Sequence, residues 1–402
     1  MDILFFIGLA IIFGFYIGKL VNYIKLPSVV GYLLAGLFLG SSFFNIINFA
    51  TLDKMNVLSD IALGIVAFII GSEMRIALLR KMGKGLLVII LAESFGAFLL
   101  VFLGVYLLTH DLPTALIFGA MAPASAPAGT VAVLKELKSK GPLTSMLYAV
   151  VGLDDGLAIM IYAFAAAIAR MFLTGNSISF AGIVKGPVFE IFGSILLGGL
   201  IGIIIGYLLR KLHRKHEVLA VSLGGILICS GLSNYLHFSL IMANLSMGMV
   251  FTNLFLFANK RSYDAINFIT TPIFIVFFVI AGAHLQIKLL PAMGLIGLIY
   301  ILCRSVGLIG GAFFGAKISK MSAIIQKYLG FGILSQAGVA IGLAILATKE
   351  FSALGEAGAH LAVLVINTIA ATTIFFEIIG PITTKIAISK AGEIGKKKTS
   401  RY

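Results

Sequence analysis

The chain has 402 residues, of which 60% are hydrophobic and only 11% carry a formal charge. About a quarter of the residues of a soluble domain are charged, and the mean hydropathy here is +1.10. These values predict a polytopic, all-α membrane protein and exclude a soluble enzyme, a nucleic-acid-binding protein and a secreted disulfide scaffold. A transmembrane β-barrel is also excluded, because its strands alternate polar and apolar residues, whereas the apolar runs here are continuous.

Thirteen segments have the length of about 20 mostly apolar residues that a membrane-spanning helix needs. The first is interpreted as a span rather than a signal peptide, because it has no basic stretch and no small-residue cleavage site. Proline, glycine, asparagine or charged residues separate the segments. In chain order the predicted spans are 3–22, 28–47, 56–77, 85–108, 114–134, 142–169, 183–209, 217–234, 238–257, 266–286, 289–315, 323–347 and 358–385.

Basic residues are distributed unevenly between the two sides of the predicted membrane. With the N-terminus outside, 24 of the 30 Lys and Arg residues fall on inner segments or the C-terminal tail, and only five fall on outer segments. Cytoplasmic loops carry such an excess, so we expect a cytoplasmic C-terminus. The net charge of +14 therefore indicates contact with anionic lipid headgroups at the inner face, and it is not evidence for a nucleic-acid partner.

Charged side chains deep in a membrane are costly and usually functional. Glu93 lies in the fourth predicted span, Asp154 and Asp155 in the sixth, Arg304 in the eleventh and Glu377 in the thirteenth. Adjacent carboxylates in a low dielectric repel one another, so the aspartate pair should bind protons, a metal cation or a basic partner. Arg304 needs an anion, for which Asp154 and Glu93 are the candidates, and an ion pair that only stabilises packing is the alternative.

The fifth span contains two helix-breaking residues near its middle. Pro123 and Pro127 each remove a backbone donor and clash with the preceding turn. Unwound backbone at membrane depth is tolerated only inside protein or along a cavity. We therefore expect a broken helix whose freed carbonyls, with the hydroxyls of Ser125 and Thr130, are suited to coordinate a cation. A simple kink is the alternative.

The twelfth span has a weaker interruption, with Ser335, Gln336 and Gly338 at mid-depth, and we expect a second unwound helix there. The broken spans are thus the fifth and twelfth, the spans with one central charge are the fourth and eleventh, and those with deep acids are the sixth and thirteenth. Each pair is seven spans apart, and an odd offset reverses the direction through the membrane. This pattern predicts two inverted repeats, spans 1–6 and 8–13, an architecture of transporters with a midplane site.

At three stretches the chain resembles the monovalent cation/proton antiporters, in the branch of paired-aspartate Na⁺/H⁺ antiporters related to Kef-type transporters. These stretches are residues 26–36 (LPSVVGYLLAG), residues 67–73 (AFIIGSE), and residues 123–137 followed by the aspartate pair. The resemblance covers nearly the whole chain. It implies a homodimer with crossed discontinuous helices. The implied parts are a dimerisation part at 1–78 and 217–286, a core at 85–169 and 289–388, a linker helix at 183–210 and a basic cytoplasmic tail at 389–402.

The resemblance implies secondary active exchange of Na⁺ or Li⁺ for H⁺ by elevator-type alternating access, in a prokaryotic inner membrane. Asp155 is then the shared ion and proton carrier and Asp154 the second acid. Neither enzymatic activity nor a resident cofactor is expected, and the partners are a monovalent cation, a proton and lipid. The residues expected to hold the transported cation are Asp155, Asp154, Ser125 and Thr130, with Ser335 and Gln336 as further ligands.

Two departures from the family pattern leave the charge stoichiometry open. Arg304 stands where electrogenic relatives usually carry Lys, and Val150 stands where electroneutral members carry Glu. K⁺/H⁺ exchange is the alternative within the same class, although the cytoplasmic nucleotide-binding domain of Kef-type systems is absent. An intramembrane aspartyl hydrolase is disfavoured because its two acids must face each other from separate helices. A channel is the third alternative, which current measurements would distinguish.

Overall fold

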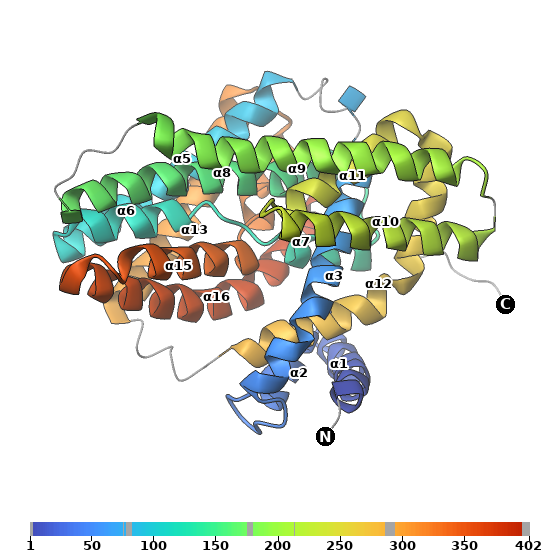
Figure 1. The fold of residues 1–402 in the computed structure, drawn as a ribbon, viewed down its shortest axis with the longest axis horizontal. Helices are drawn as coiled ribbons and strands as arrows, with labels where there is room; N and C mark the ends of the chain where they lie inside the picture. Colours follow the sequence, from blue (N-terminus) through green and yellow to red (C-terminus); the bar gives the residue numbers. More distant parts are fainter. Residues whose placement is uncertain are drawn as a thin grey trace.

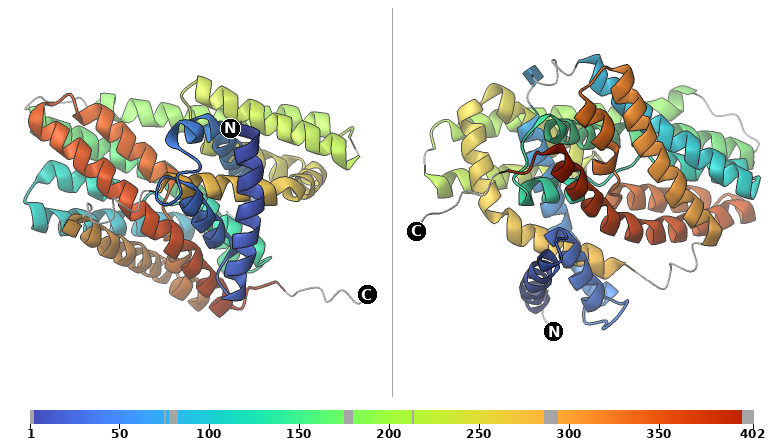
Figure 2. Two further views of the ribbon diagram at one scale, coloured as in Figure 1. Left: turned by 90° about the horizontal axis from the view of Figure 1, so that it is seen from below. Right: turned by 180° about the vertical axis from the view of Figure 1, so that it is seen from behind.

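The computed structural model describes residues 3–74, 76–77, 83–174, 180–212, 214–285 and 294–395, and within these ranges every regular element is a helix. Figure 1 labels most of these helices, and Figure 2 shows two further views. In chain order they are α1 (Ile3–Tyr23), α2 (Ser28–Leu39), α3 (Phe49–Glu73), α5 (Lys84–Thr109), α6 (Leu112–Met121), α7 (Pro127–Glu136), α8 (Pro142–Thr174), α9 (Phe180–Leu209), α10 (Lys215–Tyr235), α11 (Leu240–Leu254), α12 (Leu256–His284), α13 (Gly294–Ile318), α14 (Ala323–Tyr328), a 3₁₀ turn (Gly330–Gly332), α15 (Gly338–Phe351) and α16 (Gly355–Ala391).

The helical membrane architecture is confirmed, but the count of thirteen spans is not established. By length and composition, eight helices among the described residues are long and apolar enough to cross a membrane: α1, α5, α8, α9, α10, α12, α13 and α16. Helices α2, α6, α11 and α15 are apolar but shorter. Part of the difference arises because the fifth and twelfth predicted spans are each divided into shorter helices.

The helices pack in two groups (Figure 1). One group contains α1, α2, α3, α10, α11 and α12, and the other contains α5 to α8 and α13 to α16. The long helix α9 runs across the molecule and packs against both α8 and α11. The assignment of the first group to dimerisation and of the second to a mobile core remains a prediction.

Helices α2 and α12 cross at two glycines. A side chain at Gly36 of α2 would collide with the backbone carbonyl of Val279 in α12, and one at Gly282 of α12 would collide with that of Leu33 in α2. Each glycine therefore lies three residues after the carbonyl that its partner approaches. Small residues at such crossings let the two helix backbones approach closely.

Helices α3 and α11 repeat this crossing with the same spacing. Gly71 of α3 meets the carbonyl of Leu245 in α11, and Gly248 of α11 meets that of Phe68 in α3. Helices α2 and α3 are the second and third predicted spans, and α11 and α12 are the ninth and tenth. The crossing of the second span with the tenth therefore repeats as the crossing of the ninth with the third. The second span thus corresponds to the ninth and the third to the tenth, with an offset of seven in both cases. This correspondence is the packing expected of two inverted repeats.

We predict that Gly36→Ala lowers the thermal unfolding midpoint of the detergent-solubilised protein. The added methyl group would overlap backbone rather than a side chain, so the helices must separate, and overpacking of this kind costs about 1–3 kcal/mol. The control is Gly8→Ala on α1, where an added Cβ has no neighbour within 4 Å. Equal midpoints for Gly36→Ala and wild type would show that this crossing does not limit stability.

Helices α5 and α13 pack along much of their length through small residues. Gly96 of α5 approaches the backbone of Gly307 in α13, and Gly311 of α13 approaches the backbone of Glu93 in α5. Close packing of these backbones leaves little space between the helices. As a result, Glu93 on α5 and Arg304 on α13 are both fully buried in the same region.

The start of α8 is capped by a residue from the end of the chain. The buried carboxylate of Glu393 accepts hydrogen bonds from the backbone N–H groups of Leu143 (2.8 Å) and Thr144 (2.7 Å) and from the Thr144 hydroxyl (2.6 Å). An anion at a helix N-terminus satisfies free N–H groups and complements the helix dipole. The first residues of the predicted basic tail at 389–402 belong to the fold, because α16 continues to Ala391 and Glu393 is buried. The cytoplasmic placement of the tail remains a prediction. Residues 396–402, and Arg80 and Lys81, lie outside the described residues.

Candidate functional site: a crossover of two broken helices

The fifth predicted span is broken as expected. Helix α6 ends at Met121, and α7 begins at Pro127 with that proline in its first turn. Proline is tolerated at this position because the first N–H groups of a helix have no intrahelical partner. The segment 122–126 between the two helices is buried, so its backbone groups depend on partners from elsewhere in the protein.

The twelfth predicted span is interrupted as well, and the two breaks meet. Helix α14 ends at Tyr328, the 3₁₀ turn that follows ends at Gly332, and α15 begins at Gly338. The Ala126 N–H donates to the Ser335 carbonyl at 2.9 Å, which joins the breaks directly. The Gln336 amide donates to the Met121 carbonyl (3.1 Å) and lies 2.8 Å from the Tyr300 hydroxyl. The predicted crossed discontinuous helices are therefore present.

Arg304 of α13 holds both breaks together. Its guanidinium donates to the carbonyls of Ala122 (2.9 Å), Ala124 (2.9 Å) and Leu334 (2.8 Å), with a longer contact of 3.5 Å to Ser335. Among the described residues no acid lies within ion-pair distance of it. The broken helices thus supply carbonyls that accept from the guanidinium, while Glu93 and Asp154, the two acids expected to partner Arg304, lie within electrostatic range of it. Which of the two acids acts as its partner remains a prediction.

The face of the guanidinium is also covered. Its central carbon lies 4.3 Å from the centroid of the Phe376 ring on α16. Such a contact favours a cation electrostatically and excludes water. Arg304 therefore links α13, both broken spans and α16, and sequence reasoning identified the residue but missed all of these partners.

Asp154 and Asp155 of α8 lie next to the break in the fifth span. Asp154 is fully buried and Asp155 is 3% exposed. Ser125 interacts electrostatically with both, through its side chain with Asp154 and through its backbone with Asp155. Neither contact has full hydrogen-bond geometry, so no described protein group donates a hydrogen bond to any of the four carboxylate oxygens.

Glu93 is a third buried acid in this region. Its Oε1 accepts from the Ser94 hydroxyl at 3.0 Å, whereas its Oε2 has no partner among the described residues. Asp154, Asp155 and Arg304 all lie within electrostatic range of Glu93. One arginine and three acids thus occupy a single buried region, and the arginine is bonded to backbone. This arrangement can accept positive charge in the form of protons or a cation.

The hydroxyl groups near the crossover differ in what they bind. Thr130 donates to the Gly332 carbonyl at 2.8 Å, and Thr384 of α16 contacts the same carbonyl at 3.3 Å. The hydroxyls of Ser125 and Ser335 are buried and have no hydrogen-bond partner in the described part of the chain. Thr130 and Thr384 use their protons for backbone carbonyls, and the oxygen lone pairs of all four hydroxyls can still face a cation.

Two pockets lie on either side of this region, one after the other along α3 and α12. The Lys135 pocket has a volume of about 720 Å³ and contains Glu73, Lys135, Glu136, Tyr148 and Tyr263 in its walls. The Glu377 pocket has a volume of about 480 Å³. The polar residues that line it are Asp60, Ser125, Asn234, Ser239, Ser335 and Glu377. Ser125 also contacts both aspartates, so it connects the Glu377 pocket to them.

Sequence reasoning missed Asp60 and Glu73 as pocket residues. Both lie near the ends of a span rather than at its centre, and only the packing of α3 against the crossover places them in the pockets. The sequence feature that could have identified them is that each is an acidic residue in an otherwise apolar segment.

Comparisons with known proteins agree with this architecture. The family model for "Sodium/hydrogen exchanger, transmembrane" matches residues 8–390. The "Ammonium/H(+) antiporter subunit AmhT" of Alkalihalophilus pseudofirmus is 24% identical over an alignment of 334 residues that covers 78% of this chain and 79% of that protein.

Two structures of the sodium proton antiporter MjNhaP1 from Methanocaldococcus jannaschii share the fold. One, determined at pH 8, has a TM-score of 0.67 at 22% identity and covers 97% of this chain and 96% of that one. The other, from an electron-microscopy map, has a TM-score of 0.78 at 20% identity and covers 100% and 99%. The chain therefore belongs to the sodium/hydrogen exchanger family, as a multi-pass membrane antiporter of a monovalent cation and protons.

Proposed function

We propose that the protein exchanges Na⁺ or Li⁺ for H⁺, and that the cation and the proton compete for the carboxylate of Asp155, with Asp154 as the second acid. The observation that carries this proposal is the pair of buried carboxylates beside an unwound helix, to which no residue in the described part of the chain donates a hydrogen bond. Isolated negative charge is costly in a low dielectric. Each carboxylate is therefore stabilised by binding a proton or a cation, and one group cannot hold both.

The remaining ligands of the cation are proposed from the same geometry. The Ser125 hydroxyl is buried, has no hydrogen-bond partner within the described ranges and lies beside Asp154. Carbonyls of an unwound helix and the ends of half-helices coordinate cations in transporters. Thr130 remains a candidate as well, because its hydroxyl donates to the Gly332 carbonyl and keeps its oxygen lone pairs for a cation. The reaction needs neither covalent chemistry nor a resident cofactor.

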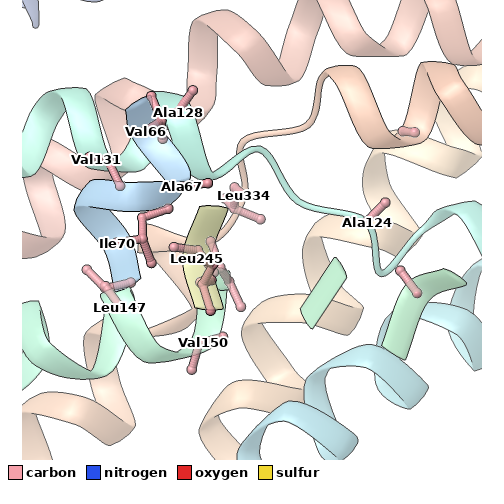
Figure 3. Packing of buried hydrophobic residues seen from close by; sticks show 14 of the residues in the cluster. Val66, Ala67, Ile70, Ala124, Ala128, Val131, Leu147, Val150, Leu245 and Leu334 are labelled. Atoms are coloured by element: carbon pink, nitrogen blue, oxygen red, sulfur yellow. The ribbon is translucent and has the colours of Figure 1, made fainter. Parts of the chain in front are cut away.

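Elevator-type alternating access is supported by the surface between the two groups of helices. Figure 3 shows Ile70 of α3 and Leu245 of α11 near Leu147 and Val150 of α8, so that apolar side chains fill the middle of this surface. Apolar contacts are non-directional, so helices sliding here lose no hydrogen bonds in the middle.

Polar contacts between the two groups lie at the side of the Lys135 pocket. The Lys135 ammonium donates to the Asn267 side-chain oxygen at 2.7 Å, and the Ser28 N–H donates to the Glu136 carboxylate at 2.8 Å. In the proposed cycle these contacts break when the Lys135 pocket opens toward the aspartates. From the positive-inside pattern we propose that this pocket faces the cytoplasm, and a homodimer is proposed from the family resemblance.

A larger monovalent cation is the second candidate substrate. The relative from Alkalihalophilus pseudofirmus is named as an ammonium/H⁺ antiporter subunit, and K⁺ and ammonium are similar in size. Ion selectivity depends on how many oxygen ligands surround the cation and how far apart they are held, and both cations are compatible with a carboxylate site.

The function is tested in proteoliposomes that carry an imposed pH gradient and a pH-sensitive dye. Addition of Na⁺ or Li⁺ should dissipate the gradient, and K⁺ and ammonium are compared under the same conditions. Repeating each assay with a clamped membrane potential reports whether net charge moves. Absence of cation-dependent proton movement with all four cations would refute antiport by this chain. A cation current that flows without a pH gradient would indicate a channel.

A further inference from the structure

The ionisable residues that line the Glu377 pocket are all acids. They are Asp60 of α3 and Glu377 of α16, and no Lys or Arg is among the described residues that line it. The Lys135 pocket differs, because Glu73 and Glu136 are accompanied there by three lysines. A concave surface lined by one sign of charge between low-dielectric walls concentrates ions of the opposite sign. The Glu377 pocket therefore favours cations over anions.

Glu377 itself is placed to bind a cation rather than to stabilise packing. Its side chain is only 7% exposed, and its Oε2 is buried without a hydrogen-bond partner among the described residues. The hydroxyls of Ser335 and Ser125, which line the same pocket, also have no hydrogen-bond partner in the part of the chain that the structure describes. A purely structural carboxylate at this depth would be expected to have hydrogen-bond donors around it, as Glu393 has at the start of α8.

Asp60 lies on the opposite group of helices from Glu377. One of its oxygens, Oδ2, accepts a hydrogen bond from the Asn234 amide at 3.1 Å, which fixes the position of the carboxylate. Asp60 is less buried than Glu377, so it faces the more accessible part of the pocket. The pocket thus presents one acid near its entrance and a second, buried acid beside the crossover.

The residues that line the Glu377 pocket form a path that leads to the aspartates of α8. Glu377, Ser335 and Ser125 line one pocket, and Ser125 contacts Asp154 and Asp155. Oxygen ligands of this type, a carboxylate with hydroxyls, suit hard cations. A cation that reaches Glu377 therefore has a set of oxygen atoms leading to the carboxylates of α8.

We propose that Glu377, with Ser335, forms a second binding site for the transported monovalent metal cation, which is occupied before the cation reaches Asp155 from the Glu377-pocket side. This inference rests on the proposed function for its physiological meaning, because the cation that binds at Glu377 is the one that is exchanged. The inference adds to the proposed function a second cation site, which binds only cations that arrive from the Glu377-pocket side of the membrane.

The test measures ²²Na⁺ uptake by the full-length protein in vesicles of defined orientation, with Glu377→Gln. When Na⁺ is supplied on the side of the α10–α11 turn, which lines the Glu377 pocket, the KM for Na⁺ should rise by about tenfold, within the range attributed to electrostatic concentration of ions. The maximal rate should change little. When Na⁺ is supplied from the opposite side, the KM should remain that of wild type.

Two further variants separate a binding role from a structural one. Glu377→Asp keeps the negative charge and should keep a KM close to that of wild type. Glu356→Gln removes an exposed acid at the start of the same helix, outside the pocket, and should leave the KM unchanged. The proposal is overturned if Glu377→Gln leaves the KM unchanged from both sides, if it raises the KM equally from both sides, or if Glu377→Asp behaves like Glu377→Gln.

A binding measurement distinguishes failure of this inference from failure of the proposed function. In detergent, the double variant Asp154→Asn/Asp155→Asn should retain weak equilibrium binding of ²²Na⁺, and adding Glu377→Gln should abolish it. No residual binding in the double variant would overturn the Glu377 site even if wild type exchanges ions. If wild type shows no exchange while the double variant still binds ²²Na⁺, the proposed function alone is refuted.

Discussion

Asp155→Asn is expected to abolish exchange, with the rate in proteoliposomes falling to that of protein-free vesicles. The amide has nearly the same shape as the carboxylate, but it neither carries the negative charge that binds a cation nor exchanges a proton at working pH. The fold should remain intact, because no described residue donates a hydrogen bond to this side chain. Cation-driven pH change and the thermal unfolding midpoint are measured on the same preparation.

The neighbouring acid provides the matched control. Asp154→Asn alters the same chemical group one position earlier on α8 and should retain exchange at a lower rate, with less charge moved per cycle. The difference between the two variants tests the assignment of the shared carboxylate. Full exchange activity in Asp155→Asn would contradict this assignment, and loss of folding in Asp155→Asn would give the side chain a structural role.

Arg304→Met is expected to have the largest effect on stability. Three short hydrogen bonds from the guanidinium to carbonyls of both breaks are lost, and each buried carbonyl left without a donor costs about 1–3 kcal/mol. The detergent-solubilised protein should therefore unfold at a markedly lower temperature than wild type. Arg304→Lys should recover only part of this loss, because an ammonium lacks the planar fork that reaches carbonyls on two segments.

Arg261 of α12 provides the comparison for this variant. Among the residues that the structure describes, its guanidinium donates to one carbonyl, that of Leu212, in a partly buried position. Arg261→Met should therefore lower the unfolding temperature much less than Arg304→Met. Equal unfolding temperatures for Arg304→Met and wild type would show that the carbonyls of the crossover do not depend on Arg304.

The sequence was sufficient to predict the breaks and the deep acids, because each follows from a local rule. Pro123 and Pro127 lie four residues apart, and each removes a backbone donor and clashes with the preceding turn. A buried charge such as Asp155 stands out in an apolar segment. The inverted repeat was predicted from the positions of these features alone, and the glycine crossings agree with it.

The partners of the predicted residues were not predictable, because they come from distant parts of the chain. The carbonyls bound by Arg304 lie 30 to 182 positions away, and Glu393 caps a helix about 250 positions earlier. Backbone acceptors are present at every residue, so no sequence pattern shows which of them a helix break exposes. The same holds for Asp60, whose role depends on how α3 packs against the crossover.

The most direct test of the account is a count of protons released when Na⁺ binds. Isothermal titration calorimetry of the detergent-solubilised protein, in buffers of different ionisation enthalpy, measures this number. Because a carboxylate ligand must be deprotonated to bind a metal cation, the account predicts proton release on Na⁺ binding, an affinity that weakens as the pH falls, and loss of the release in Asp155→Asn. Na⁺ binding without proton release, at an affinity independent of pH, would contradict competition at the aspartates.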